Sequence, residues 1–192
     1  MKIIVEEKKR NWRNEIIIAV MVVIAVIGSD LLINGLPGSS PPWITFESQE
    51  GNFSILFPKQ PTQNTQILRT AYGNVNQYIF TVNDTNGIYY TISYTDIPLQ
   101  SFENRTIDEI LDSATAGEVN GVGGTLISET VISINGSQGR EVNISVAQGD
   151  YRIRAQHFFI GQRLYQLVVI APKDYIELKT VRNFLDSFEL KP

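Results

Sequence analysis

The feature that most constrains the fold of this chain is a series of segments in which apolar side chains alternate with other residues, joined by turn residues. Within residues 88–95, every second side chain is apolar or aromatic, which places four of them on one face of an extended segment: Ile88, Tyr90, Ile92 and Tyr94. Residues 83–87 are rich in Asn and Asp, end in Gly, and connect this segment to 75–82. Two further pairs show the same pattern, 126–134 with 140–146 and 151–160 with 163–170. Consecutive hairpins of this kind predict an antiparallel sheet.

Two segments have helical periodicity. Thr106 and Glu109 have the spacing of a capping box, and the residues after them predict a helix of about 13 residues. Its apolar face comprises Ile107, Ile110, Leu111 and Ala114. A second helix is predicted to begin at Pro172, a residue suited to a first helical turn, with one apolar face made of Tyr175, Leu178, Val181, Leu185 and Phe188. This order of strands and helices predicts an α+β fold, an antiparallel β-sheet covered by two helices.

A long apolar segment lies near the N-terminus. Residues 16–28 contain no polar side chain, and apolar character resumes at Leu31 after Ser29 and Asp30. If the segment continues to Leu36, a helix over 16–36 is about 31 Å long and spans a bilayer. If it ends at Gly28, it has the length of a signal-peptide core that is cleaved near Gly28. A buried helix of a soluble protein is the third alternative, and we favour the transmembrane anchor.

Charged residues predict the orientation of this anchor. Lys8, Lys9, Arg10 and Arg13 precede the apolar segment, and no basic residue follows until Lys59. The positive-inside rule then predicts a cytoplasmic N-terminus at 1–15 and an extracytoplasmic domain at 43–192. Residues 37–42 are rich in Gly, Ser and Pro and are interpreted as a linker. Trp43 is interpreted as the start of the folded domain.

Composition excludes several chemistries. The chain has no Cys and one His, which rules out disulfides, thiol nucleophiles, iron–sulfur ligation and Cys-based or multi-His metal sites. Its net charge is −4, and the domain beyond residue 37 is more acidic than the whole, so nucleic-acid binding is not expected. We therefore predict no cofactor and no metal site.

His157 is the natural candidate for a general base. It shares one strand face with Ile153 and Phe159, and the sequence has no nucleophile-elbow motif to accompany it. A structural role is favoured, so no catalytic residue is predicted.

Four arginines are candidates for binding a partner. Arg152 and Arg154 share the opposite face of the same strand, and Arg140 and Arg163 lie near hairpin ends. Together they would form a clamp for a carboxylate or phosphate of a partner. The alternative is a solvated sheet face with Glu129 and Glu141 as cross-strand neighbours.

Several polar motifs have simpler interpretations. Five Asn-x-Ser/Thr triplets are candidate glycosylation sites on an outward-facing domain, or reflect turn-rich composition: Asn52, Asn83, Asn104, Asn135 and Asn143. Residues 83–87 lack the ligand spacing of a calcium loop and are interpreted as a turn. Asp108 and Asp112 lie one helical turn apart and are interpreted as solvating the helix.

Several segments resemble the PsbP-like domain family. These are residues 53–58 with Pro61, the Tyr-rich segment ending in Asp96-Ile97-Pro98, Gly139-Arg140-Glu141, residues 152–167, and residues 184–188. The resemblance covers 43–190 and implies an α/β/α sandwich that acts by binding other proteins. Photosystem members of that family assist a manganese–calcium cluster without catalysing a reaction. That role is not carried over, because this chain has a predicted anchor and no recognisable cluster of metal ligands.

These observations predict a non-catalytic, membrane-anchored extracytoplasmic domain that binds a protein partner in an envelope or thylakoid assembly. One alternative is an exported carrier of a small ligand or lipid, since the sandwich contains many Tyr and Phe residues. A hydrolase that uses His157 is the third alternative.

Overall fold

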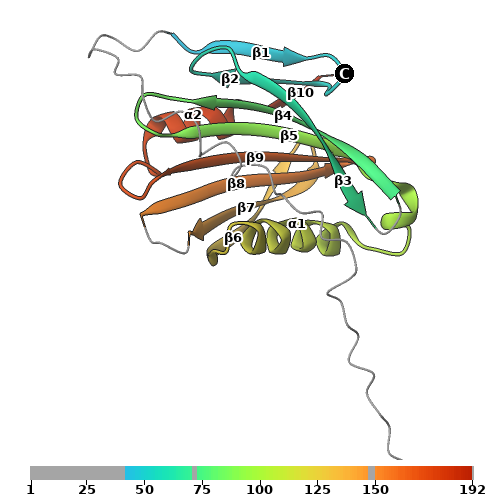
Figure 1. The fold of residues 1–192 in the computed structure, drawn as a ribbon. Coiled ribbons are helices and arrows are strands. Elements are labelled where there is room, and N and C mark those ends of the chain that lie inside the picture. The colour runs from blue at the N-terminus through green and yellow to red at the C-terminus, as the bar shows by residue number, and fades with distance from the viewer. Residues whose placement is uncertain (1–41, 71–72, 147–149, 192) are drawn as a thin grey trace, which may run out of the picture.

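The computed structural model describes residues 42–70, 73–146 and 150–191. These residues form ten strands and two α-helices, arranged in two antiparallel sheets (Figure 1). The strands are β1 (Ile44–Ser48), β2 (Phe53–Phe57), β3 (Thr62–Thr70), β4 (Gly73–Asn83), β5 (Tyr89–Asp96), β6 (Thr125–Ile134), β7 (Ser137–Ser145), β8 (Tyr151–Ile160), β9 (Arg163–Pro172) and β10 (Glu189–Leu190). The helices are α1 (Ile107–Gly121) and α2 (Lys179–Asp186).

Seven strands form the large sheet, in the order β3-β4-β5-β9-β8-β7-β6. The three predicted hairpins are β4–β5, β6–β7 and β8–β9, and the predicted antiparallel sheet is confirmed. Asn135 and Gly136 connect β6 to β7 with φ angles of 49° and 82°. Positive φ at both positions is typical of the two-residue turn that best matches the twist of a hairpin.

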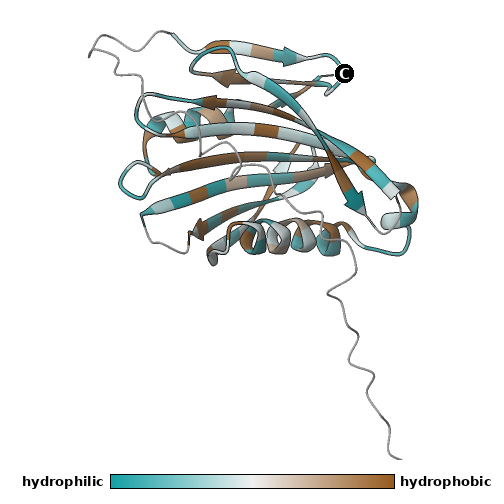
Figure 2. Cartoon of the chain, in the orientation of Figure 1, coloured by the Kyte–Doolittle hydropathy of each residue, from teal (hydrophilic) through white to brown (hydrophobic). Residues whose placement is uncertain are grey.

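One face of the large sheet is covered by the small sheet, of strand order β1-β2-β10, and by α2. Aromatic side chains fill the space between them. Phe53 on β2 lies at its centre, with its ring centroid 5.9 Å from Phe80 and 6.3 Å from Tyr165. Trp43 packs edge to face on Tyr90, with centroids 5.3 Å apart. Figure 2 shows the hydrophobic residues of these strands alternating with hydrophilic ones.

The opposite face of the sheet carries α1, which packs on β7 and β8. The predicted capping box is present, because the Thr106 hydroxyl accepts from the Glu109 amide and the Glu109 carboxylate accepts from the Thr106 amide. Three of the predicted apolar residues are buried, namely Ile110, Leu111 and Ala114. The prediction was wrong for Ile107, which is exposed at the first position of the helix.

The second predicted helix begins later than expected. Pro172 ends β9 opposite Tyr151, and α2 begins at Lys179. Between them the chain makes turns in which the Tyr175 amide donates to Pro172 and the Leu178 amide to Tyr175, at 2.8 and 3.1 Å. These turns leave the side chains of Tyr175 and Leu178 exposed. Val181, Leu185 and Phe188 are buried as predicted, although Phe188 lies just beyond the helix.

The predicted cytoplasmic segment, anchor and most of the linker, residues 1–41, lie outside the described residues. Within the ranges that the structure describes, neither helix is long and apolar enough to span a bilayer.

Candidate functional site

The four candidate arginines do not form a common clamp. Arg140 pairs in register with His157 across β7 and β8, so it faces α1, whereas Arg152 and Arg154 face the small sheet and α2. Arg163 lies on the same face of the sheet as Arg154, but far from it. Arg163 pairs with Ile160, which lies six residues beyond Arg154 on β8, and six residues of a strand span about 20 Å. The positions of the four side chains depend on the register between β7 and β8, which the sequence alone does not determine.

Arg140 holds α1 against the sheet. Its guanidinium donates to Asp108 and lies 3.6 Å from Asp112 and 3.7 Å from Glu129. This hydrogen bond, together with a second one from Gln138, keeps the pKa of Asp108 below its usual value. The interpretation that Asp108 and Asp112 merely solvate the helix was therefore wrong, since both carboxylates face a buried cation.

Arg154 belongs to a second ion-pair network, between the sheet and α2. Its Nη2 and Nε donate to one oxygen of Glu141, at 2.8 and 3.1 Å, and Nη1 donates to Glu177 at 3.1 Å. Arg182 on α2 also contacts Glu141, at 3.1 Å. The predicted cross-strand neighbour Glu141 is confirmed, and it occupies the guanidinium that the clamp hypothesis required. Arg152 donates to the Ser145 hydroxyl instead.

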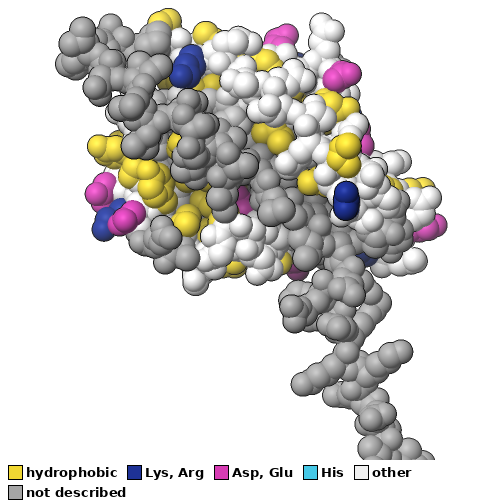
Figure 3. Space-filling view, viewed as in Figure 1, with side chains coloured by type: hydrophobic (Ala, Val, Ile, Leu, Met, Phe, Trp, Pro, Cys, Tyr) yellow, Lys and Arg dark blue, Asp and Glu magenta, His cyan; other side chains and the backbone are white. Residues whose placement is uncertain are grey.

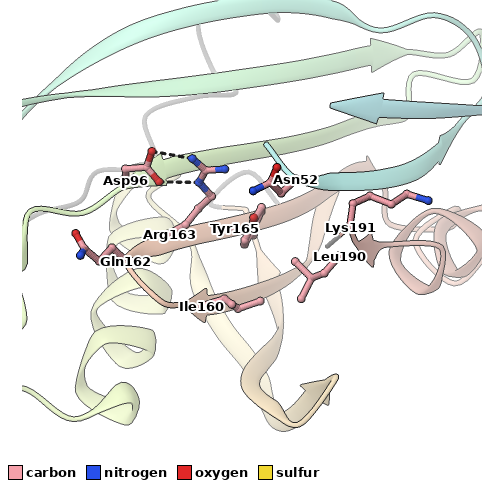
Figure 4. A pocket seen from close by; sticks show the side chains of 8 residues that line it. All are labelled: Asn52, Asp96, Ile160, Gln162, Arg163, Tyr165, Leu190 and Lys191. Carbon is pink, nitrogen blue, oxygen red and sulfur yellow. Dashed lines mark hydrogen bonds and ion pairs between the residues drawn. The ribbon is translucent and has the colours of Figure 1, made fainter. Parts of the chain in front are cut away.

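Arg163 lines a cleft where the small sheet meets the ends of β5 and β9 (Figure 4). The cleft measures about 350 Å³, and its walls are Asn52, Asp96, Ile160, Gln162, Arg163, Tyr165, Leu190 and Lys191. The Arg163 guanidinium donates to both oxygens of Asp96, at 2.6 and 2.8 Å, and to the Glu50 carbonyl at 2.6 Å. It also lies over the Tyr94 ring, 4.6 Å from the centroid.

Carboxylates limit what the cleft can bind. Asp96 neutralises Arg163, and Lys191 lies 3.7 Å from Glu47 and 3.9 Å from Glu189. Both cations of the cleft are therefore already paired, which weakens their attraction for a free anion. Burial, followed by the charge of Glu50, raises the pKa of Tyr94 to about 12.

His157 is fully buried and contacts α1. Its Nε2 lies 2.7 Å from an oxygen of Glu118, and both side chains are at most 1% exposed. Its Nδ1 and the second oxygen of Glu118 have no hydrogen-bond partner among the described residues. A substrate in solvent has no access to this imidazole. The pair joins β8 to α1, in keeping with the structural role favoured for His157.

The five glycosylation candidates differ in exposure. Asn52, Asn104 and Asn135 are exposed in turns or connections, whereas Asn83 and Asn143 are half-buried in strands. Asn143 donates to the Ser128 hydroxyl at 2.9 Å, which occupies its amide.

Asn83–Gly87 forms the predicted turn, in which Asp84 accepts from the amides of Asn86 and Ile88.

The most distinctive surface is one that the sequence did not predict, the outer edge of the large sheet at β6 (Figure 1). The strand pairs with β7 alone among the described strands, and eight of its ten residues are exposed. Val131 is 62% exposed, Ile127 55% and Leu126 40%. Alternation in the sequence assigned β6 to the sheet, but it could not show that this strand lies at the end of the strand order.

The other edge of the sheet, β3, is more polar. Its sequence is TQNTQILRT, and one large hydrophobic side chain, Ile67, is exposed there. On the face shown in Figure 3, described Lys and Arg side chains are few and stand apart from one another. A surface without clustered basic side chains does not favour a polyanion as ligand.

Comparison with known proteins identifies the fold. No protein-family model and no curated protein sequence matches the chain. Its fold is similar to cyanobacterial PsbP (CyanoP) from Synechocystis sp. PCC 6803, with 12% identity, a TM-score of 0.55, and coverage of 81% of this chain and 98% of that one. The protein PA94 of unknown function from Pseudomonas aeruginosa has 11% identity and a TM-score of 0.42, over 70% of this chain and 85% of that one. The first match supports the PsbP-like fold that the motifs implied.

Proposed function

We propose that this chain is a non-catalytic, membrane-anchored extracytoplasmic domain that binds a protein partner through the β6 edge. The observation that carries the proposal is the exposure of β6 along nearly its whole length. An edge strand presents unpaired backbone donors and acceptors, and it can receive one further strand by hydrogen bonding. The exposed side chains of Val131 and Ile127 would add apolar contact area beside the hydrogen bonds to such a strand.

The titratable groups support a role without catalysis. Arg140, Arg154 and His157 are buried in contacts that join the helices to the sheet. These contacts hold the fold together and leave the groups inaccessible to a substrate. The membrane part of the proposal rests on the apolar segment 16–36 and the basic residues before it.

The cleft beside Arg163 favours a second candidate function, the binding of a small polar ligand. Its volume of about 350 Å³ is at the lower end of the usual range for ligand sites. Native mass spectrometry of the full-length chain, released from detergent, tests this candidate. A bound small molecule that is lost in Arg163→Ala supports it, and a bare chain mass contradicts it.

The proposed function is tested by affinity capture of full-length tagged chain from native membranes. We compare wild type with Val131→Lys, which places a charge on the β6 edge, and with the matched control Ile67→Lys on the β3 edge. We expect the protein that copurifies with wild type to be reduced at least tenfold by Val131→Lys and to remain with Ile67→Lys.

The two variants are comparable because both residues are more than 60% exposed, so neither should unfold the domain. Circular dichroism checks this directly. A partner that is captured equally by all three chains contradicts the use of β6.

A further inference from the structure

We infer that the strand which docks on β6 is β6 of a second copy of this chain, antiparallel to the first across a two-fold axis at Thr130. The inference rests on the proposed function, because it names the partner of the same edge.

From Ser128 to Ile134, beyond an irregularity in its pairing with β7, the β6 edge lacks most of the features that usually prevent pairing between copies. Residues 125–134 contain no Lys, Arg, Pro or Gly, which are common protective residues on edge strands. Glu129 is the one charged residue of the strand, and its carboxylate accepts from the Thr115 hydroxyl at 2.9 Å and lies 3.7 Å from Arg140. The charge is therefore partly neutralised by groups of its own molecule.

The side chains of β6 allow an antiparallel copy to pair in a register that brings no like charges together. An axis at Thr130 places Thr130 opposite its copy, Glu129 opposite Val131, and Ser128 opposite Ile132. Paired threonines are favourable on an antiparallel sheet, and no like charges meet in this register. An axis at Glu129 would instead place two carboxylates directly opposite each other, which is unfavourable.

An irregularity in the ladder locates the paired region. The pairing of β6 with β7 shifts register between Leu126 and Ser128, and a bulge of this kind bends and twists the strand. The regular part of the strand begins at Ser128. An axis at Thr130 pairs Ser128 with Ile132, so the new ladder at residues 128–132 lies within this regular part.

The symmetry suits two chains anchored in one membrane. A two-fold axis perpendicular to the large sheet leaves the small sheets of both copies on the same face of the joined sheet. Each chain enters the described fold at Pro42, directly before β1 of the small sheet. Pro42 of both copies then lies on one face of the joined sheet. Tethering of both copies to a membrane raises their effective concentration and favours a modest strand-to-strand interface.

Single cysteines test the register, because the chain has no Cys of its own. We introduce Ser128→Cys, Thr130→Cys and Ile132→Cys into the full-length chain, with Ile67→Cys on β3 as the control. Membranes that contain each variant are oxidised, and the disulfide-linked dimer is measured on a non-reducing gel. Paired Cα atoms on antiparallel strands lie about 4.5–5.5 Å apart, within the range of a disulfide.

We expect Thr130→Cys to form at least ten times more dimer than Ser128→Cys, Ile132→Cys or Ile67→Cys alone. At an axis at Thr130, residues 128 and 132 lie roughly 13 Å from their own copies along the strand direction, beyond the reach of a disulfide. Coexpressed Ser128→Cys and Ile132→Cys chains with different tags should form a mixed dimer, because these positions then face each other.

Two results would overturn the inference. Equal crosslinking at all four positions would indicate random collision, and no crosslinking at Thr130 would show that β6 does not meet its copy there. If a different protein is captured and lost in Val131→Lys while Thr130→Cys stays monomeric, the proposed function stands and self-pairing is wrong. If Val131→Lys changes no interaction and Thr130→Cys is monomeric, both fail.

Discussion

Both faces of the large sheet combine apolar packing with buried polar contacts, but in different proportions. The face toward the small sheet and α2 is dominated by aromatic rings around Phe53. The face toward α1 includes buried polar groups, among them His157, Glu118 and Arg140. Apolar burial provides a large free energy of folding that depends little on direction, whereas a hydrogen bond or ion pair requires one geometry. The comparison indicates that the aromatic face contributes most stability and the polar face fixes the position of α1.

The largest effect is expected on the aromatic face. Phe53→Ala removes a ring that is 0% exposed and touches several other rings. A buried Phe→Ala substitution costs about 3–5 kcal/mol of unfolding free energy, through lost burial and the cavity that remains. Urea denaturation measures this loss. Ile67→Ala on the exposed edge is the control and should change stability by less than about 1 kcal/mol. A similar loss in both variants would contradict the contrast between core and edge.

A smaller effect is expected on the polar face. His157→Leu removes one partner of the buried pair and leaves the Glu118 carboxylate without its hydrogen bond. This should cost about 1–3 kcal/mol, because an unpaired buried polar group keeps its desolvation penalty. The double variant His157→Leu/Glu118→Leu should recover part of the loss, since neither polar group then remains. Additive losses, measured in the same denaturation series, would show that the two residues do not act as a pair.

The smallest effect is a pH dependence on the aromatic face. The pKa of Tyr94 is raised to about 12, chiefly by burial. A raised pKa favours the protonated phenol in the folded state, so its contribution to stability is complete below about pH 10 and is lost between pH 10 and 12. Burial also raises the pKa of Tyr90 and Tyr165. We therefore expect ultraviolet absorbance to show one fewer late-ionising tyrosine in Tyr94→Phe than in wild type. Ionisation of every tyrosine near pH 10, while the protein is still folded, would contradict this.

The sequence predicted the parts of the fold that depend on neighbouring residues. Alternation in β5 and the Asn135–Gly136 turn are local signals, and both led to correct hairpins. The capping box at Thr106 is equally local. Strand β3 was missed because its residues are mostly polar and do not alternate. The start of α2 was misplaced because the turns between Pro172 and Leu178 place apolar residues at spacings close to those of a helix.

The candidate sites depended on contacts between distant residues, and the sequence could not supply them. Arg140 reaches Asp108 across 32 positions, and His157 reaches Glu118 across 39. Alternation correctly separated Arg154 from His157 on opposite faces of β8. It could not show that Arg140 joins His157, because that depends on the register between two strands. The exposed edge at β6 follows from strand order, which is a property of the whole sheet.

The sole histidine of the chain also provides a built-in spectroscopic probe. Because the sequence contains one His, imidazole carbon–hydrogen signals in a nuclear magnetic resonance spectrum would arise from His157 alone. That ring lies at the contact between β8 and α1. Its chemical shift and line width would therefore report any separation of α1 from the sheet in the full-length chain, without an added label.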